Sequence, residues 1–355
     1  MHVVQENIHI RPVEHSRLSE VDMNNIPFGK VFSDHMLIAR FEGGSWKTPE
    51  IVPFGALPFK PSMSALNYGQ SIFEGMKAHK GPNGEALLFR PDENIRRLND
   101  SAARLCMEPI PEHIFMDGLK ALIRQDKAWM PNIEQGSLYI RPVYFATDDS
   151  IGVHASEDYM LSIFTSPVGL YYAKPVSLLA TKDYVRASIG GTGSAKAAGN
   201  YASALLPDKI AKAQGYHNVL WLDGREHQYI EECGTMNVFF VIEGTVITPN
   251  LTGTILPGIT RNSVLRVLRD NGYKVETRPI SIYEVQEAYR EGVLEDAFGV
   301  GTAAAVTHID RIGFGGSDMH LPPVEDRTTS NWLKDQVNGM RTGLIADPYG
   351  WVMAL

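Results

Sequence analysis

The chain has little cysteine, no long apolar run and no excess of basic residues. Two cysteines, Cys106 and Cys233, occur among 355 residues, which excludes a disulfide scaffold and a cysteine-rich zinc site. Acidic residues outnumber basic ones by 41 to 33, for a formal charge of −8, which argues against a general nucleic-acid-binding surface. The sequence contains no run of about 18 apolar residues, the length needed to span a membrane. The N-terminus lacks the apolar region of a secretory signal. We therefore expect a cytoplasmic protein with no metal centre and no nucleic-acid or membrane partner.

What the chain does have is an ordinary globular composition, with 44% hydrophobic and 21% charged residues. Its length suggests about two domains. We expect a smaller N-terminal α/β domain at residues 1–165, a linker at 166–178, where prolines and turn residues gather, and a larger, hairpin-rich C-terminal domain at 179–355. Strands that pair as hairpins, with helices between them, predict an α+β fold rather than a doubly wound parallel sheet.

The hydrophobic pattern places the expected elements along the chain. Strands are predicted at residues 31–41, at 161–165, and at 138–145 with Pro142 at an edge or a bulge. Turn residues predict hairpins at 77–89, 219–229 and 238–248. Helices are predicted at 91–105, 112–130, 201–214 and 260–271, and a capping box at Ser281 opens another.

The glycine-rich run at residues 188–201 contains a single lysine, Lys196. It lacks the last glycine of the dinucleotide fingerprint and the Gly-Lys-Ser/Thr of a P-loop, so neither phosphate motif is assigned. Two interpretations remain from this segment alone. Lys196 is either a surface lysine in a glycine loop or a lysine in a close-packed turn that a planar cofactor approaches.

Three downstream segments favour the cofactor. Glu231 and Glu232 enter an apolar strand, where a carboxylate is costly unless it meets a positive partner. Pro257 and Gly258 precede a predicted helix, whose N-terminus is a ready anion site. Residues 298–305 form a small-residue turn with free N–H groups. A lysine, a carboxylate and two amide-rich turns match the needs of pyridoxal 5'-phosphate: an imine to the lysine, an acid at the pyridine nitrogen and donors for the phosphate.

The order and spacing of these motifs resemble the branched-chain amino acid aminotransferases, which belong to fold type IV of the pyridoxal-phosphate enzymes. The resemblance covers nearly the whole chain. It is carried by residues 196–201, 232–237, 255–258 and 301–303, and in the first half by 28–29, 34–36, 66–75, 138–142 and 166–171.

The resemblance implies a role for each cofactor-binding residue. Lys196 would form the imine and carry the α-proton, because one positioned amine serves as acid and base. Glu232 would keep the pyridine nitrogen protonated, and Arg97 would clamp the phosphate. Leu256 would pack on the face of the ring, and Tyr201 would hydrogen-bond the phenolic oxygen. The phosphate would accept hydrogen bonds from the amides of Ile259 and Thr260 and from the hydroxyl of Thr302.

The resemblance also implies a substrate site for small amino acids and 2-oxo acids. An apolar chamber for leucine, isoleucine and valine would be formed by Phe28, Tyr68, Phe73, Tyr139 and Tyr171. Arg141 would receive the side-chain carboxylate of glutamate. Thr235, Gly301 and Ala303 would face the α-carboxylate. Val153 corresponds to a loop that reaches the other subunit's site, so a homodimer is implied.

Two alternatives stay open at this stage. Another fold type IV enzyme, such as a D-amino-acid aminotransferase, an amine transaminase or a lyase making 4-aminobenzoate, would share the lysine, the glutamate and the phosphate turns. A catalytically silent phosphate-binding or scaffold protein is the second alternative, which the intact set of Lys196, Glu232, Arg97 and Thr302 disfavours. The sequence does not rank leucine, isoleucine and valine, because one methylene is worth only about 1–3 kcal/mol.

Overall fold

The computed structural model describes residues 8–169 and 174–355 and divides the chain into two compact units. Unit 1 comprises Met1–Tyr171, Ala195–Gly199 and Met340–Leu355, and unit 2 comprises Tyr172–Ser194 and Asn200–Gly339. Two later segments thus cluster with the N-terminal strands, and unit 1 is larger than the N-terminal domain expected from the sequence. The predicted substrate residue Tyr171 lies outside the described residues.

Unit 1 is built on a ten-stranded, mostly antiparallel sheet in the order β1-β4-β2-β9-β8-β6-β7-β19, with β3 on β2 and β5 on β8. The one parallel pair described in it is β1–β4. The strands are β1 (His9–Ile10), β2 (His35–Glu42), β3 (Ser45–Trp46), β4 (Glu50–Pro53), β5 (Ser71–Phe73), β6 (Met76–Lys80), β7 (Ala86–Phe89), β8 (Gly136–Ala146), β9 (Tyr159–Gly169) and β19 (Val352–Ala354).

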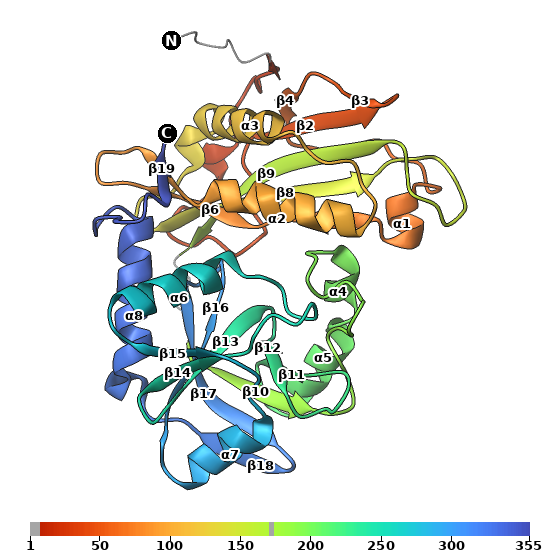
Figure 1. Ribbon diagram of the computed structural model, residues 1–355. Coiled ribbons are helices and arrows are strands. Elements are labelled where there is room, and N and C mark those ends of the chain that lie inside the picture. Colours follow the sequence, from red (N-terminus) through yellow and green to blue (C-terminus); the bar gives the residue numbers. More distant parts are fainter. Residues whose placement is uncertain (1–7, 170–173) are drawn as a thin grey trace. The chain divides into compact units, whose positions relative to one another are not determined.

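Two helices, α2 (Pro91–Arg104) and α3 (Glu112–Gln125), cover this sheet (Figure 1). α2 starts with a proline and two acids in its first turn, as a helix N-terminus favours. It buries Ile95, Leu98 and Ala102, which share one core cluster with side chains of β2 and β8. The smaller elements of unit 1 are α1 (Ser64–Tyr68) and the 3-10 turns at Leu18–Glu20 and Lys127–Trp129.

The prediction that Pro142 lies at an edge or a bulge is wrong, because β8 is an interior strand with regular pairing to β9 across Pro142. Proline is tolerated here because its missing N–H faces the break between β5 and β6. On that side Glu74 N donates to Pro142 O at 2.9 Å, and Glu74 and Gly75 belong to neither strand. The break in the sheet that accommodates Pro142 therefore also positions Glu74.

Unit 2 contains a nine-stranded sheet in the order β12-β11-β10-β17-β16-β13-β14-β15, with β18 on β17. β12 also pairs with β13, so the strands from β12 to β13 form a closed ring. The sheet is mixed, because β10–β11, β10–β17 and β14–β15 are parallel. The strands are β10 (Val176–Thr181), β11 (Asn218–Leu222), β12 (Ile230–Cys233), β13 (Met236–Ile242), β14 (Thr245–Thr248), β15 (Lys274–Thr277), β16 (Leu294–Val300), β17 (Val306–Phe314) and β18 (Ser317–His320).

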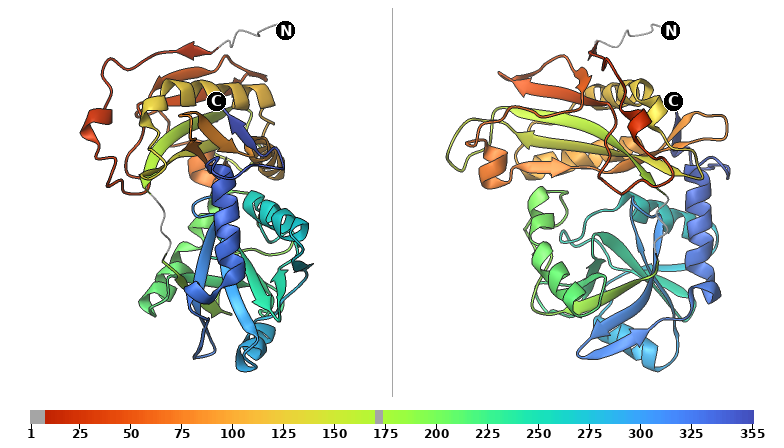
Figure 2. Two further views of the ribbon diagram at one scale, coloured as in Figure 1. Left: turned by 90° about the vertical axis from the view of Figure 1, so that its left-hand side faces the viewer. Right: turned by 180° about the vertical axis from the view of Figure 1, so that it is seen from behind.

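In the described part of the chain, five helices, α4 to α8, accompany the sheet of unit 2. The last of them, α8, runs alongside its strands (Figure 2). The helices are α4 (Ala198–Ala202), α5 (Leu205–Ala213), α6 (Ile259–Asp270), α7 (Ile282–Arg290) and α8 (Thr328–Arg341), with a 3-10 turn at Val324–Asp326. The single helix predicted at 201–214 is instead two, α4 and α5. Pro207 explains the break, because its ring conflicts with the carbonyl four residues earlier, at Ser203. Among the described residues, no helix is long and apolar enough to cross a membrane.

Other local predictions are confirmed, some with shifted ends. The helices predicted at 91–105 and 260–271 agree with α2 and α6 to within one residue, and Ser281 caps α7 by accepting from Glu284 N at 3.0 Å. The helix predicted at 112–130 ends as α3 at Gln125, and the strand predicted at 31–41 begins as β2 at His35. The strand predicted at 161–165 lies inside β9, which continues to Gly169, so the first part of the predicted linker is strand.

The predicted hairpins also form. β6 pairs with β7, and β13 with β14 through a turn in which Glu243 and Gly244 have positive φ. In the third hairpin the second strand starts later than predicted, at Ile230. The Asp223 carboxylate explains the delay, because it accepts the backbone N–H groups of Arg225, Glu226, Gln228 and Tyr229 and holds these residues in a loop.

Candidate active site

Lys196 lies in the short segment that unit 1 takes from the middle of the chain. Its backbone is held on both sides: Lys196 N donates to Ser101 Oγ of α2 at 2.9 Å, and Phe73 N of β5 donates to Lys196 O at 3.1 Å. Its Nζ lies 4.8 Å from the centroid of the Phe73 ring. Burial, and then the nearby cation Arg97, lower the pKa of the Lys196 amine to about 8. Lys196 is thus a half-buried lysine whose pKa lies close to neutral pH, not a surface lysine.

The predicted phosphate residue, Arg97, forms a two-pronged ion pair with Glu74. Arg97 Nε lies 2.7 Å from Glu74 Oε1, and Arg97 Nη2 lies 2.8 Å from Glu74 Oε2. Asn94 and Gly75 N also donate to Oε2, at 2.8 and 3.1 Å. Burial opposes ionisation of this fully enclosed carboxyl, but Arg97, Lys196 and Asn94 together outweigh burial and hold its pKa below the usual value.

Glu74 is a functional candidate that the sequence interpretation did not single out. It sits beside Phe73 in the break opposite Pro142, and its charge acts on Lys196 by raising the lysine pKa. A carboxylate between an aromatic residue and a glycine was the available signal. Its partner lies 23 positions further along the chain, so no local pattern reveals the pair.

Four predicted substrate residues of unit 1 are brought together around the Lys196 neighbour Phe73. The Arg141 guanidinium lies 4.8 Å from the Phe73 ring centroid, and its Nη2 donates to Tyr139 Oη at 3.0 Å. The Phe28 and Tyr139 rings meet edge to face at 5.5 Å. Gly75 is required beside them, because a Cβ there would lie 2.3 Å from Tyr139 Oη.

Tyr68 and Val153 belong to a different part of unit 1. Tyr68 Oη accepts from Gly152 N at 2.9 Å, so Tyr68 fixes the loop that carries Val153. Val153 and Ile151 are 90% and 83% exposed. The structure therefore joins Tyr68 to the exposed loop and describes no contact between it and the Phe73 group.

In unit 2, Glu232 is buried on β12 and is paired by the chain itself. Arg186 Nη2 lies 3.0 Å from Glu232 Oε1, and Leu256 N donates to the same oxygen at 2.7 Å. The positive partner that a buried carboxylate needs is thus a protein guanidinium. Arg186 was not predicted, and nothing in the sequence around it marks it.

A β-bulge places Glu232 and its neighbour Glu231. Leu220 of β11 pairs with Cys233 of β12, and Leu222 pairs with Ile230. One residue of β11 lies between these pairs and two residues of β12 do, so β12 carries one extra residue. Glu231 and Glu232 together oppose Trp221. Bulges re-aim side chains and are common beside active sites.

The glycine-rich run has a packing role in unit 2. A Cβ at Gly193 would lie 2.4 Å from Thr254 O and 2.6 Å from the Ala187 side chain. Arg186 Nη2 bonds the carbonyls of both Gly193 and Thr254. Gly193 therefore lets the run pack closely against Thr254, in the loop that precedes Leu256.

The other predicted cofactor residues of unit 2 lie on α4, on α6 and on two turns. α6 starts after Gly258 without a side-chain cap, and Ile259 and Thr260 occupy its first turn. Asn237 Nδ2 donates to Leu256 O at 3.0 Å and fixes the preceding turn. Thr302 lies in the turn after β16, beside Gly301 and Ala303, and Tyr201 is half-buried on α4. Thr235 is exposed in the turn between β12 and β13.

Comparison with known proteins gives consistent matches. The family model described as amino-transferase class IV matches residues 71–312. The chain is 45% identical over 334 residues to branched-chain-amino-acid aminotransferase 2 of Bacillus subtilis, covering 93% of this chain and 92% of that protein. It is 44% identical to a probable branched-chain-amino-acid aminotransferase of Staphylococcus aureus, covering 93% of each.

Among solved structures, the chain is similar to the branched-chain amino acid aminotransferase from Escherichia coli. The TM-score is 0.72 at 26% identity, covering 90% of this chain and 98% of the other. A second solved branched-chain amino acid aminotransferase, which contains pyridoxamine 5'-phosphate, is similar with a TM-score of 0.73 at 26% identity, covering 89% of this chain and 97% of the other. The expected two-domain fold type IV architecture is thereby confirmed.

Proposed function

The chain belongs to the amino-transferase class IV family and, within it, to the branched-chain-amino-acid aminotransferases, and we propose that it transfers the amino group between L-leucine, L-isoleucine or L-valine and 2-oxoglutarate. The observation that carries this proposal is Lys196, a half-buried lysine of pKa about 8 that packs on Phe73. The charges of Arg97, Glu74 and Arg141 act on its amine. An amine near neutrality both accepts and returns a proton close to pH 7, as this reaction requires.

The cofactor is pyridoxal 5'-phosphate, and the donors present suit it. When bound, it supplies the electron sink for the reaction. Lys196 would hold its aldehyde carbon and Glu232 its ring nitrogen, while Leu256 would pack on the ring and Tyr201 would donate to the phenolic oxygen. The phosphate would be held by the uncapped first turn of α6 at Ile259 and Thr260, by Thr302 and by Arg97.

Lys196 performs the proton transfers in this proposal. With the cofactor and a substrate bound, Lys196 Nζ would take up the α-proton of the substrate and return it later in the reaction. Burial keeps the amine partly unprotonated, and Glu74 limits how far its pKa falls. Arg186 and the Leu256 amide both contact Glu232 Oε1, and each favours a negative charge there.

The substrate contacts divide by charge. Phe28, Phe73 and Tyr139 provide an apolar surface for branched side chains, and Arg141 receives the side-chain carboxylate when glutamate is the donor. Tyr68, Tyr171 and Val153 complete the proposed chamber, and Thr235, Gly301 and Ala303 face the α-carboxylate.

We further propose a cytoplasmic homodimer. The support for the dimer is the exposed apolar pair Ile151 and Val153, held outward by the Tyr68 contact with Gly152. The domain boundaries at 165 and 179 remain part of the proposal. Sedimentation analysis of the wild type and of Val153→Asp tests the dimer, which the added charges should weaken.

The activity is tested with a panel of amino donors and 2-oxoglutarate. We expect the purified holoenzyme to turn over L-leucine, L-isoleucine and L-valine and to leave D-alanine and (R)-1-phenylethylamine unreacted. Turnover of the D-amino acid or of the amine, without that of L-leucine, would overturn the proposal in favour of another enzyme of this fold. A protein that binds the cofactor and transfers nothing would show a silent homologue.

A further inference from the structure

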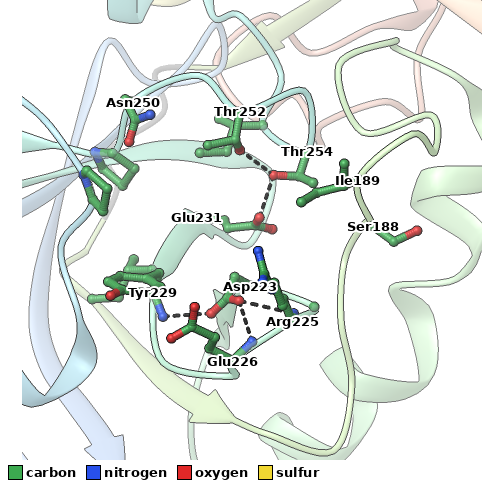
Figure 3. A pocket seen from close by; sticks show the side chains of 15 residues that line it. Ser188, Ile189, Asp223, Arg225, Glu226, Tyr229, Glu231, Asn250, Thr252 and Thr254 are labelled. Carbon is green, nitrogen blue, oxygen red and sulfur yellow. Dashed lines mark hydrogen bonds between the residues drawn. The ribbon is translucent and has the colours of Figure 1, made fainter.

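Unit 2 contains a pocket of about 500 Å³ that the proposed reaction does not use (Figure 3). All of its lining residues belong to unit 2, and none is among the proposed cofactor or substrate residues. Much of its wall is apolar, from Ile189, Ile230, Pro249, Ile255 and Pro279. Its volume lies within the range of about 300–1,000 Å³ usual for small-molecule sites.

One carboxylate, Glu231, is buried in the wall of this pocket. Its residue is 5% exposed. Thr254 Oγ1 donates to Oε1, as Figure 3 shows, and Oε2 has no hydrogen-bond partner. A buried acceptor without a donor is costly and rare in folded proteins. The apolar wall of the pocket thus contains a buried carboxylate oxygen that has no hydrogen-bond partner.

The charged groups around Glu231 do not meet that need. Arg186 is bonded to Glu232 and to two backbone carbonyls, and no ion pair to Glu231 occurs within the described residues. Asp223 is occupied by four backbone N–H groups. Glu226 and Arg225 line the pocket at exposed positions. The lining therefore carries three carboxylates and one guanidinium.

Burial dominates the acid–base behaviour of Glu231. It raises the pKa of the carboxyl to about 7, with Glu232 and Asp223 adding to the rise and Arg186 and the Thr254 hydroxyl opposing it. Glu231 therefore changes between its neutral and its ionised form near neutral pH. A cation placed against it would favour the ionised form.

We propose that this pocket binds a small organic ammonium ion with a compact apolar body, the ammonium donating to Glu231 Oε2 and the body packing on Ile189 and Ile255. The acceptor selects the ammonium group, and the excess of carboxylates excludes a small anion. The apolar wall excludes a bare metal ion, for which the described residues offer no cluster of three His, Cys, Asp or Glu side chains.

The test uses 1-adamantylammonium as the probe and isothermal titration calorimetry of the holoenzyme at pH 8. This amine has no α-hydrogen and cannot be a transamination substrate. 1-Adamantanol serves as its uncharged counterpart. We expect saturable binding of the amine and at least about tenfold weaker binding of the alcohol, as loss of a hydrogen bond to a charged group predicts.

Three variants locate the binding. Glu231→Gln should weaken it about tenfold or more, whereas Glu226→Gln, on the exposed rim of the same pocket, should not. Lys196→Ala should leave it unchanged, because the amine does not act through the cofactor. No saturable binding to the wild type, equal binding by Glu231→Gln, or loss in Lys196→Ala would overturn the proposal.

A pH series on the wild type keeps the test decisive if Glu231→Gln does not fold. The probe remains protonated from pH 6 to 8, while Glu231 passes from mostly neutral to mostly ionised. The affinity should therefore rise about tenfold over that range. An affinity independent of pH would show that Glu231 is not the partner.

Discussion

Unit 1 holds two partly buried lysines, Lys77 and Lys196, whose pKa values are both lowered to about 8. Lys77 lies on β6, where burial and then Arg341 lower its pKa. For Lys196, burial, Arg97 and Arg141 lower the pKa, whereas the carboxylate of Glu74 raises it. The comparison teaches that a shifted pKa alone does not identify a catalytic lysine. What distinguishes Lys196 is a set of groups that can hold an anionic substrate and cofactor beside it.

The largest expected effect separates the two lysines directly. Lys196→Ala should lower turnover of L-leucine by about 10⁴-fold, because one group supplies both proton transfers. It should also abolish the covalent attachment of the cofactor, measured by mass spectrometry after borohydride reduction. Lys77→Ala is the matched control and should keep the attachment. Attachment lost in Lys77→Ala and kept in Lys196→Ala would reverse the assignment.

The second prediction removes Glu74, the carboxylate that raises the pKa of Lys196. Glu74→Gln removes the carboxylate that pairs with the buried Arg97, which should lower the free energy of unfolding by about 3–5 kcal/mol. The control, Glu93→Gln, breaks ion pairs to Arg90 and Arg96 nearer the surface and should cost at most about 1 kcal/mol. Urea unfolding of the two variants measures the difference.

The pH dependence of that loss has a definite sign. The folded-state pKa of Glu74 is below its usual value of 4.5, so the stability from its charge is present above pH 4.5 and is lost as the pH falls below it. The gap between wild type and Glu74→Gln should therefore narrow in acid. A gap that is constant with pH would show that packing, not the charge, is responsible.

The surroundings of Lys196 and Glu232 also show what a sequence can and cannot reveal. The helix α2 was predictable because its apolar spacing, leading proline and first-turn acids are local features. Lys196 and Glu232 were found through motifs that are contiguous in the chain. Their ion-pair neighbours were not, because Glu74–Arg97 and Arg186–Glu232 join residues that are distant in sequence. Only the closed fold brings them together.

The same reason explains the errors in the strands. Pro142 was assigned to an edge because proline cannot donate to a neighbouring strand, and the sequence does not show that the neighbouring strand is interrupted there. The late start of β12 depends on the Asp223 side chain capturing four N–H groups, whereas the residue pattern alone resembles a continuous hairpin. Local rules were correct, but their tertiary context was absent.

The third prediction concerns Arg141, one of the two cations that lower the pKa of Lys196. Arg141→Gln should slow the half-reaction with L-glutamate by about 10–100-fold, because the side-chain carboxylate loses a charged donor. The half-reaction with L-leucine should change little. Single-turnover spectroscopy with each donor measures both, with the substitution of an exposed arginine, Arg96→Gln, as control. Equal losses for the two donors would show that Arg141 positions Tyr139 and Phe73 rather than selecting glutamate.

The smallest expected effect lies at Lys77. Its folded-state pKa of about 8 is below the usual value of 10.5, so the folded protein binds fewer protons than the unfolded chain between these values. Stability from this group therefore rises with pH over that window, and the cost of burying the charge is fully present below pH 8.

Lys77→Met keeps about the same side-chain length without the charge and should stabilise the holoenzyme by about 1 kcal/mol at pH 7. The gain should fade as the pH rises from 8 to 10.5, as followed by urea unfolding at several pH values. In the proposed holoenzyme Lys196 would contribute no such rise, because its nitrogen would be bonded to the cofactor. A gain that persists at pH 10.5 would assign the effect to packing of the methionine, and destabilisation at pH 7 would show that Lys77 is held by favourable contacts that outweigh its burial.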